Sequence, residues 1–159
     1  MIRIGLGIDC HQFTSGRPLI LGGVVVPHPF GLAGHSDADV LTHAVMDALL
    51  GAASLGDIGQ HFPDTDPLYK GISSLVLLAR VGKLVQQKGY GIENIDSTLV
   101  MEIPHMAPYI FHCCKNIATA LEIEIEKISV KATTAEAMGA IGRKEGIAAL
   151  AVALLESSR

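Results

Sequence analysis

Segments rich in apolar residues recur along the chain at the length and spacing of β-strands. The N-terminal segment 2–8 (IRIGLGI) predicts one strand, and segment 18–27 (PLILGGVVVP) predicts two short strands that form a hairpin around its paired glycines. Further strands are expected at 95–102 (IDSTLVME), 127–132 (KISVKA) and 146–155 (GIAALAVALL), because β-branched and other apolar residues gather there.

Between these strands the apolar residues follow a helical period. A helix is expected over 37–53, where apolar residues recur at helical spacing after a capping-box pattern at 36–39. Two more helices fit 73–89 and 107–121, the first of them with serine at its start and glycine at its end. This order of elements predicts a single α+β domain over 1–159, with a mixed sheet of about four strands and helices on one face.

The last predicted strand, 146–155, bears on assembly. It has no polar residue in ten positions, so neither of its faces suits water. Three helices can cover only one face of a sheet, and we therefore expect the other face to be buried against further copies of the chain. The alternative is that this apolar run forms a buried terminal helix.

Composition narrows the class of protein. With 159 residues, 49% of them hydrophobic, the chain can form one substantial core and is short for two domains. Its net charge is -4, and its 12 lysines and arginines are scattered, which leaves no basic face for a nucleic-acid backbone. A nucleic-acid partner is therefore not expected.

The N-terminus and the cysteines indicate a compartment. The chain enters a predicted strand at Ile2 without a preceding basic segment, and no window approaches about 20 uninterrupted apolar residues, so we expect neither a targeting signal nor a membrane partner. Its three cysteines, Cys10, Cys113 and Cys114, are odd in number and two are adjacent, which favours reduced thiols over disulfides. We expect a cytoplasmic protein, with Cys10 a small buried residue.

An acid and a histidine stand two positions apart in GIDCH, at the end of the first predicted strand. Side chains two apart on a strand point to the same face, so Asp9 and His11 are aimed together and Cys10 is aimed away. The pair could be an ordinary ion pair or two corners of a metal site. With His43 from the first predicted helix, it completes two histidines and one carboxylate, the protein ligand set of a catalytic zinc site with an open fourth position.

Segment 56–67 (GDIGQHFPDTDP) is rich in glycine, proline and aspartate and shows no helix or strand period. It predicts a tight loop to which Asp57, Asp64 and Asp66 supply carboxylates. Carboxylates accept hydrogen bonds from hydroxyl groups, so this loop suits a polyol substrate. Aspartates in turns also cap their own backbone, and we expect this of Asp66 before the other two.

Segment 130–143 (VKATTAEAMGAIGR) carries the opposite chemistry, because a predicted strand ends there in two threonines. Hydroxyls, exposed backbone N–H groups and the Arg143 guanidinium bind phosphate, and Glu136 could hold a divalent cation against it. Alternatively, Thr133 or Thr134 is the N-cap of a short helix with Glu136 as its capping-box partner. Since a helix start is itself an anion site, both interpretations can hold.

Three motifs carry a resemblance to a known family over nearly the whole chain. They are GIDCH at 7–11, GHSDADVLTHAVMDALLGAASLGDIGQHFPDTDP at 34–67 and VKATTAEAMGAIGRKEGI at 130–147. With these motifs the sequence closely resembles the 2-C-methyl-D-erythritol 2,4-cyclodiphosphate synthases, enzymes of isoprenoid-precursor synthesis by the non-mevalonate pathway. The second motif is specific over more than thirty residues.

The resemblance implies two metal ions and two catalytic residues. Asp9, His11 and His43 would bind one Zn²⁺ per chain. Glu136 would bind Mg²⁺ or Mn²⁺ together with the substrate diphosphate. His35 would stabilise the transition state, and it would act with a threonine of the third motif, Thr134.

The resemblance also implies which residues contact substrate. Segment 57–66 would hold the methylerythritol part, 101–107 and 132–134 would line a cytidine pocket, and Thr134 with Arg143 would steady the diphosphate. The full set implied to bind substrate is Asp9, Cys10, His11, His35, Ser36, Asp57, Ile58, Gly59, Phe62, Pro63, Asp64, Thr65, Asp66, Met101, Glu102, Ile103, Pro104, His105, Met106, Ala107, Ala132, Thr133, Thr134, Glu136 and Arg143.

The implied reaction converts 4-diphosphocytidyl-2-C-methyl-D-erythritol 2-phosphate to the 2,4-cyclodiphosphate and releases CMP. The 2-phosphate of the substrate itself attacks the β-phosphorus, so the protein need supply only positioning and charge neutralisation. Two alternatives remain. A zinc-dependent phosphoesterase would use the same ligands to activate water and release inorganic phosphate. A catalytically inactive relative would be a trimeric binding protein.

The resemblance further implies a homotrimer, with sheets packed around the trimer axis and sites shared between neighbouring chains. The chain departs from the family at a few positions. His105 stands where relatives commonly carry lysine, so that a fixed positive contact becomes a titratable one. Ala140 and Leu150 stand where some relatives carry an aromatic residue and a glutamate beside an axial cavity. We expect synthesis to survive these changes.

Overall fold

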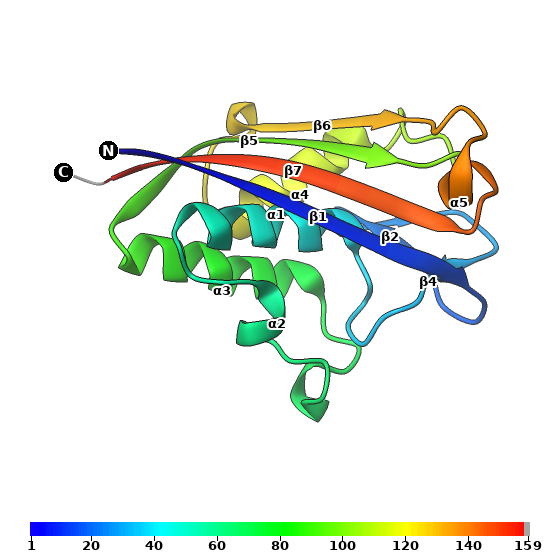
Figure 1. Cartoon of the computed structure of the whole chain (residues 1–159), viewed down its shortest axis with the longest axis horizontal. Coiled ribbons are helices and arrows are strands. Elements are labelled where there is room, and N and C mark those ends of the chain that lie inside the picture. Colours follow the sequence, from blue (N-terminus) through cyan, green and yellow to red (C-terminus); the bar gives the residue numbers. More distant parts are fainter. Residues whose placement is uncertain (158–159) are drawn as a thin grey trace.

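A mixed sheet organises the computed structural model, which describes residues 1–157 (Figure 1). Five strands lie in the order β4-β1-β7-β5-β6, in which β5 and β6 are parallel and the other neighbours antiparallel. Their bounds are β1 Ile2–Thr14, β4 Gly31–Leu32, β5 Tyr90–Val100, β6 Ile128–Thr133 and β7 Gly146–Ser157. The sequence predicted about four strands; the additional one is β4, whose two residues are too few to leave a pattern.

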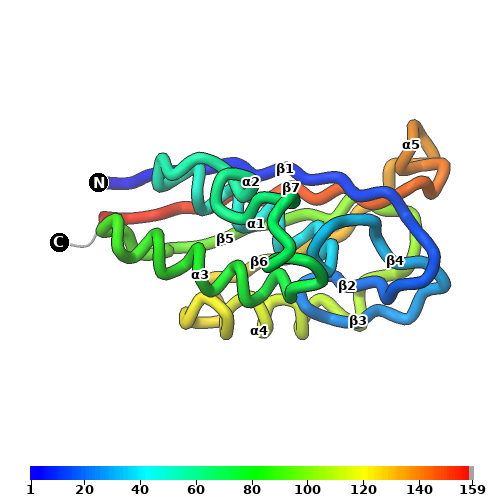
Figure 2. The backbone as a smooth tube through the Cα atoms, turned by 90° about the horizontal axis from the view of Figure 1, so that it is seen from below, coloured from blue at the N-terminus to red at the C-terminus, as the bar shows by residue number. Residues whose placement is uncertain are grey.

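Three long helices cover one face of this sheet, and Figure 2 views the molecule from their side. They are α1 (Val40–Ala52), α3 (Ser74–Gln87) and α4 (Ile110–Leu121). The shorter elements are the hairpin β2 (Leu19–Leu21) and β3 (Val24–Val26), the short helices α2 (Ile58–His61) and α5 (Gly139–Gly142), and the 3-10 turns η1 (Pro67–Tyr69) and η2 (Ile125–Lys127). The predicted α+β class with helices on one face is confirmed. No helix in residues 1–157 has the length and apolarity needed to cross a membrane.

Helix starts differ from the sequence predictions. Helix α1 begins at Val40 with Asp39 as its N-cap, because the Asp39 carboxylate accepts the Thr42 backbone N–H at 3.1 Å. The predicted capping box, with Ser36 as the cap, is therefore wrong. Helix α4 also begins later than predicted, at Ile110.

Two alternatives that the sequence left open are resolved by the fold. Segment 146–155 lies within strand β7 and is not a terminal helix. The threonines at the end of β6 do not cap a helix either, since the next helix, α5, has Met138 as its N-cap. The Thr134 hydroxyl donates instead to the Glu136 carboxylate at 3.0 Å.

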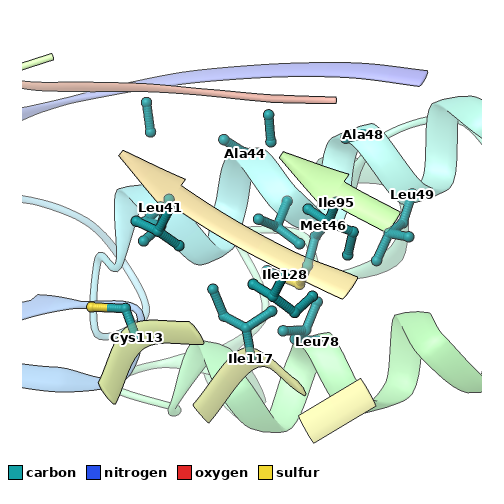
Figure 3. Packing of buried hydrophobic residues seen from close by; sticks show 14 of the residues in the cluster. Leu41, Ala44, Met46, Ala48, Leu49, Leu78, Ile95, Cys113, Ile117 and Ile128 are labelled. Carbon is teal, nitrogen blue, oxygen red and sulfur yellow. The ribbon is translucent and has the colours of Figure 1, made fainter. Parts of the chain in front are cut away.

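The core lies between the sheet and the three helices (Figure 3). Helix α1 runs through its centre, with Leu41, Met46 and Leu49 fully buried, and Leu78 of α3 and Ile117 of α4 pack beside it. Burying a side chain of this size contributes about 1.5–3 kcal/mol. Nearly all residues of α1 are buried, so the position of the helix is fixed. Side chains at its N-terminal end are therefore fixed in place as well.

On its other face the sheet is apolar and uncovered along β1 and β7 in the single chain. On β1, Ile4, Leu6 and Ile8 are 71%, 61% and 56% exposed, and on β7 Val152 is 39% exposed. Cys10 continues this outward alternation and is exposed, so the prediction that it is buried is wrong. A contiguous apolar surface of this kind marks an interaction site, which is the feature that the predicted oligomer requires.

Two glycines set how closely α1 approaches β1. A Cβ placed on Gly5 would lie 2.0 Å from the backbone oxygen of Ala48, and one on Gly7 would lie 1.9 Å from that of Ala44. Residues two apart on a strand share a face, so the same face continues to Asp9. The glycines thus bring the start of α1 against the functional end of β1.

We expect Gly7→Ala to lower the free energy of unfolding by about 1–3 kcal/mol, the usual cost of overpacking. The added Cβ meets helix backbone, which cannot rotate away as a flexible side chain could. Gly91→Ala on β5 is the matched control, because the nearest atom to its new Cβ is 3.9 Å away. Chemical denaturation measures both, and equal stabilities would contradict the close β1–α1 contact.

Candidate active site

Three predicted metal ligands come together where β1 passes the start of α1. The distances between their facing atoms are 2.8 Å for Asp9 Oδ2 to His11 Nε2, 3.2 Å for His11 Nε2 to His43 Nδ1, and 3.1 Å for His43 Nδ1 to Asp9 Oδ2. One oxygen and two nitrogens therefore point at one place and could hold a metal ion. Strand β1 supplies the first two through its two-residue period, and α1 supplies the third.

The donor set fits a divalent cation. A tetrahedral ion at about 2.0–2.1 Å from each ligand would separate the ligands by about 3.4 Å, slightly more than the observed spacing. The Nδ1–H of His11 donates to the Ala33 backbone oxygen, so a neutral His11 ring has its lone pair on Nε2, the atom that faces Asp9 and His43. Three ligands would leave a fourth position for a phosphate oxygen or water.

Close contact shifts the pKa values of Asp9 and His11. Burial disfavours the charged Asp9 carboxylate, but its hydrogen bonds with His11 and His43 outweigh burial and hold the pKa of Asp9 well below its ordinary value. Burial lowers the pKa of His11, whereas its hydrogen bonds to Asp9 and to the Ala33 carbonyl raise it, and the net pKa is raised. Asp9 is therefore an anion at neutral pH, as a metal ligand must be.

A cavity of about 400 Å³ opens beside the three ligands. The residues predicted to contact sugar or phosphate that line it are His35, Ser36, Ile58, Gly59, Phe62, Pro63 and Asp64. Sequence reasoning missed four further lining residues, namely Gly34, Met46, Tyr69 and Leu77. Met46 could have been found, because it follows His43 by three positions on one helix and so shares its side.

Other predicted contacts do not line this cavity. The Asp57 and Asp66 carboxylates each accept a backbone N–H of their own short helix, at 3.0 and 2.9 Å. Backbone capping was expected of Asp66 and is confirmed there, and Asp57 does the same. His35 Nε2–H donates to the Asp66 backbone oxygen at 2.9 Å, which ties the loop to the ring. Thr65 is also outside the lining, and Cys10 lies on the exposed sheet face.

A second cavity, of about 410 Å³, lies where β5 and β6 end. These strands are parallel and in register up to Val100 opposite Thr133, so their ends meet at one edge of the sheet. The predicted residues that line the cavity are Met101, Glu102, Pro104, His105, Met106, Ala107, Ala132, Thr133 and Thr134. Ile103 does not line it, and Ile110 of α4 is a lining residue that sequence reasoning missed.

The loop after β6 is anchored by Glu102. The Glu102 carboxylate accepts the backbone N–H groups of Ala135 at 2.8 Å and of Ala137 at 3.4 Å. Glu136, between them, is exposed towards solvent apart from its contact with Thr134, so its carboxylate is accessible to a cation. Glu102 thus orders the loop that presents the predicted diphosphate ligands.

Arg143 is not brought to the threonines within this chain. Its Nε donates to the Glu145 carboxylate at 2.6 Å, both side chains are exposed, and Arg143 lines neither cavity. The two cavities also share no lining residue. The predicted site is therefore divided into two separate halves in the single chain, one with the metal ligands and one with the threonines.

Fold and site together define an α+β protein in which three residues that could hold a divalent metal ion lie beside a cavity. The chain belongs to the YgbB family, whose model matches residues 2–156. Its curated relatives include the 2-C-methyl-D-erythritol 2,4-cyclodiphosphate synthase of Chlorobium phaeobacteroides (strain BS1), 60% identical over 158 residues that cover 99% of both chains. The enzyme of that name from Prosthecochloris aestuarii is 60% identical over 155 residues, which cover 98% of this chain and 99% of the relative. The predicted family is confirmed.

Solved structures share the fold along the chain. The bifunctional IspDF from Campylobacter jejuni superposes with a TM-score of 0.95 at 43% identity over 99% of this chain, which spans 42% of that longer protein. The CDP complex of IspF from Plasmodium falciparum superposes with a TM-score of 0.87 at 34% identity, covering 99% of this chain and 97% of the other.

Proposed function

We propose that this chain is a cyclodiphosphate synthase, a phosphorus–oxygen lyase of the non-mevalonate isoprenoid pathway. It converts 4-diphosphocytidyl-2-C-methyl-D-erythritol 2-phosphate to 2-C-methyl-D-erythritol 2,4-cyclodiphosphate and CMP. The observation that carries the proposal is the convergence of Asp9, His11 and His43 beside a cavity, in a chain 60% identical to synthases of that name.

The reaction requires the protein to position the substrate and to neutralise phosphate charge. An oxygen of the 2-phosphate forms a bond to the β-phosphorus, and the bond from that phosphorus to the CMP oxygen breaks, so no enzyme nucleophile is needed. A divalent ion at the three ligands would neutralise phosphate charge and orient its oxygens. His35 lines the same cavity, and its Nε2–H donates to the Asp66 backbone oxygen, so its Nδ1 can donate to a phosphate oxygen when the ring is protonated.

The cytidine end fits the second cavity. Residues of 101–107 other than Ile103, and residues 132–134, line it, and the solved P. falciparum relative is a CDP complex. Thr134 and Glu136 lie together at its edge, which suits a diphosphate with Mg²⁺ or Mn²⁺. Arg143 would steady the same diphosphate by exchanging Glu145 for a phosphate oxygen.

We further propose a homotrimer in which neighbouring chains complete each site. Two observations support it: the cavities share no residue, and the face of the sheet that carries Ile4, Leu6 and Ile8 is apolar and uncovered. In a cyclic assembly a patch on one chain meets a different patch on the next, which can bring the metal half of one chain to the nucleotide half of its neighbour.

Product analysis tests the activity. Purified protein incubated with the cytidyl substrate and Mg²⁺ is expected to release CMP together with an equal amount of the cyclodiphosphate, both visible by phosphorus NMR. Release of inorganic phosphate instead would identify a zinc-dependent phosphoesterase. Substrate that binds but stays intact would identify an inactive binding protein.

A further inference from the structure

The second ring nitrogen of His43 is bound inside the protein. Its Nε2 lies 3.0 Å from the Ser74 hydroxyl oxygen and 3.1 Å from that of Ser36. Ser74 is completely buried and is the first residue of α3, 31 positions away in sequence. A residue of α3 therefore contacts the metal ligand of α1 on the side opposite Asp9.

Ser74 is itself held by a carboxylate. Its hydroxyl donates to Asp37 Oδ1, and its backbone N–H donates to Asp37 Oδ2 at 2.9 Å. The backbone N–H of Asp39 also donates to Asp37 Oδ1, at 3.2 Å. Ser73, the N-cap of α3, makes no side-chain cap hydrogen bond, so Asp37 serves the start of that helix in its place.

The protons in this chain of contacts can be assigned. An ionised carboxylate only accepts, and a hydroxyl has a single proton to donate. Because Ser74 gives its proton to Asp37, its oxygen can meet His43 Nε2 only as an acceptor, so Nε2 carries the ring hydrogen. A neutral imidazole then has its lone pair on Nδ1, the atom that faces Asp9 and His11.

Ser36 does not decide the tautomer. Its oxygen accepts the Ala38 backbone N–H at 3.2 Å, and its own proton is committed to no carboxylate. It can therefore face His43 Nε2 as a donor or as an acceptor. His11 has the equivalent second partner in the Ala33 backbone oxygen, which no side-chain substitution removes.

We infer that Ser74 and Asp37 are positioning residues that hold neutral His43 in the tautomer with hydrogen on Nε2 and the lone pair on Nδ1. They thereby set the affinity of the site for its metal ion. The inference rests on the metal site of the proposed function but not on its reaction. Loss of the partner that holds a metal-ligating histidine typically costs about 10–100-fold in metal affinity.

Metal affinity of the apo-protein tests this, by Zn²⁺ titration in competition with a chromophoric chelator. Ser74→Ala is expected to bind Zn²⁺ about 10–100-fold more weakly than the unmodified chain. Asp37→Asn is nearly isosteric and is expected to act in the same direction, because its amide can donate to Ser74 and free the hydroxyl proton for His43 Nε2. Ser73→Ala removes an exposed hydroxyl from the adjacent position and should leave the affinity unchanged.

A second measurement separates the tautomer from general loosening. Imidazole ¹⁵N NMR of the apo-protein, recorded at a pH at which the His43 ring is neutral, should show His43 protonated at Nε2 in the unmodified chain and in Ser73→Ala, and shifted towards Nδ1–H in Asp37→Asn. Unchanged Zn²⁺ affinity in both Ser74→Ala and Asp37→Asn would overturn the inference, as would weaker binding with an unchanged His43 tautomer in Asp37→Asn. Since neither measurement involves turnover, failure of the synthase assay would leave the result intact.

Discussion

His43→Ala is expected to lose the bound metal. Its synthase activity is expected to fall by roughly 10²–10³-fold. Two ligands, Asp9 and His11, remain, and two protein ligands fall short of the three that a catalytic zinc site uses. We expect the chain to stay folded, because the imidazole lies at the edge of a cavity and not within the apolar core.

Elemental analysis gives the readout, with near-stoichiometric zinc per chain expected before the substitution and little after it. His28→Ala is the matched control: His28 stacks on Phe13, with ring centroids 5.1 Å apart, and lines neither cavity. Zinc retained by His43→Ala would remove His43 from the site. A metal-free variant with full activity would show that the metal has no part in the reaction.

Local periodicity was enough to predict one side of the metal site but not the other. Asp9 and His11 share a face because a strand repeats every two residues, and that repeat survives in β1. The place of His43 depends on which strand α1 lies under, and the sequence showed this only through the family resemblance. The close approach of α1 to β1 at Gly5 and Gly7 is a non-local contact. No local sequence pattern shows that a helix packs against a strand glycine.

Aspartates illustrate a different limit. Asp57 and Asp66 were predicted to supply carboxylates to a substrate loop, but both cap elements of three or four residues that are too short to show a period. An aspartate that caps and one that binds a ligand look alike in sequence. Asp37 was assigned to the first helix, yet its carboxylate lies at the start of α3, a contact across 37 positions that only the folded chain reveals.

The exposed face of the sheet was predictable because it depends on composition rather than on contacts. An apolar run on both faces of β7 already indicated that the helices would leave one face uncovered, and Leu150 and Val152 are there in the fold. The sequence pattern did not show that this face is apolar on only part of the sheet. On β5 and β6 the same face carries polar residues, with Lys131 paired to Asp96.

Mixed oligomers provide the sharpest test of the shared site. One variant, His43→Ala, is dead in the metal half, and a second, Thr134→Val with Glu136→Ala, is dead in the nucleotide half, so each is expected to be inactive alone. Refolded together in equal amounts, they should regain activity at about one quarter of the level of the unmodified protein, because random assembly puts two intact halves at that fraction of the junctions.

The expected recovery depends on where a site is built. If every site were made within one chain, each chain in the mixture would still carry one dead half, and mixing would restore nothing. Mass spectrometry of the intact assemblies establishes that mixed trimers have formed, and separate refolding of each variant gives the background. Mixed trimers without activity would place the whole site in a single chain, whereas recovery near one quarter requires the Asp9, His11 and His43 of one chain to work with the Thr134 and Glu136 of its neighbour.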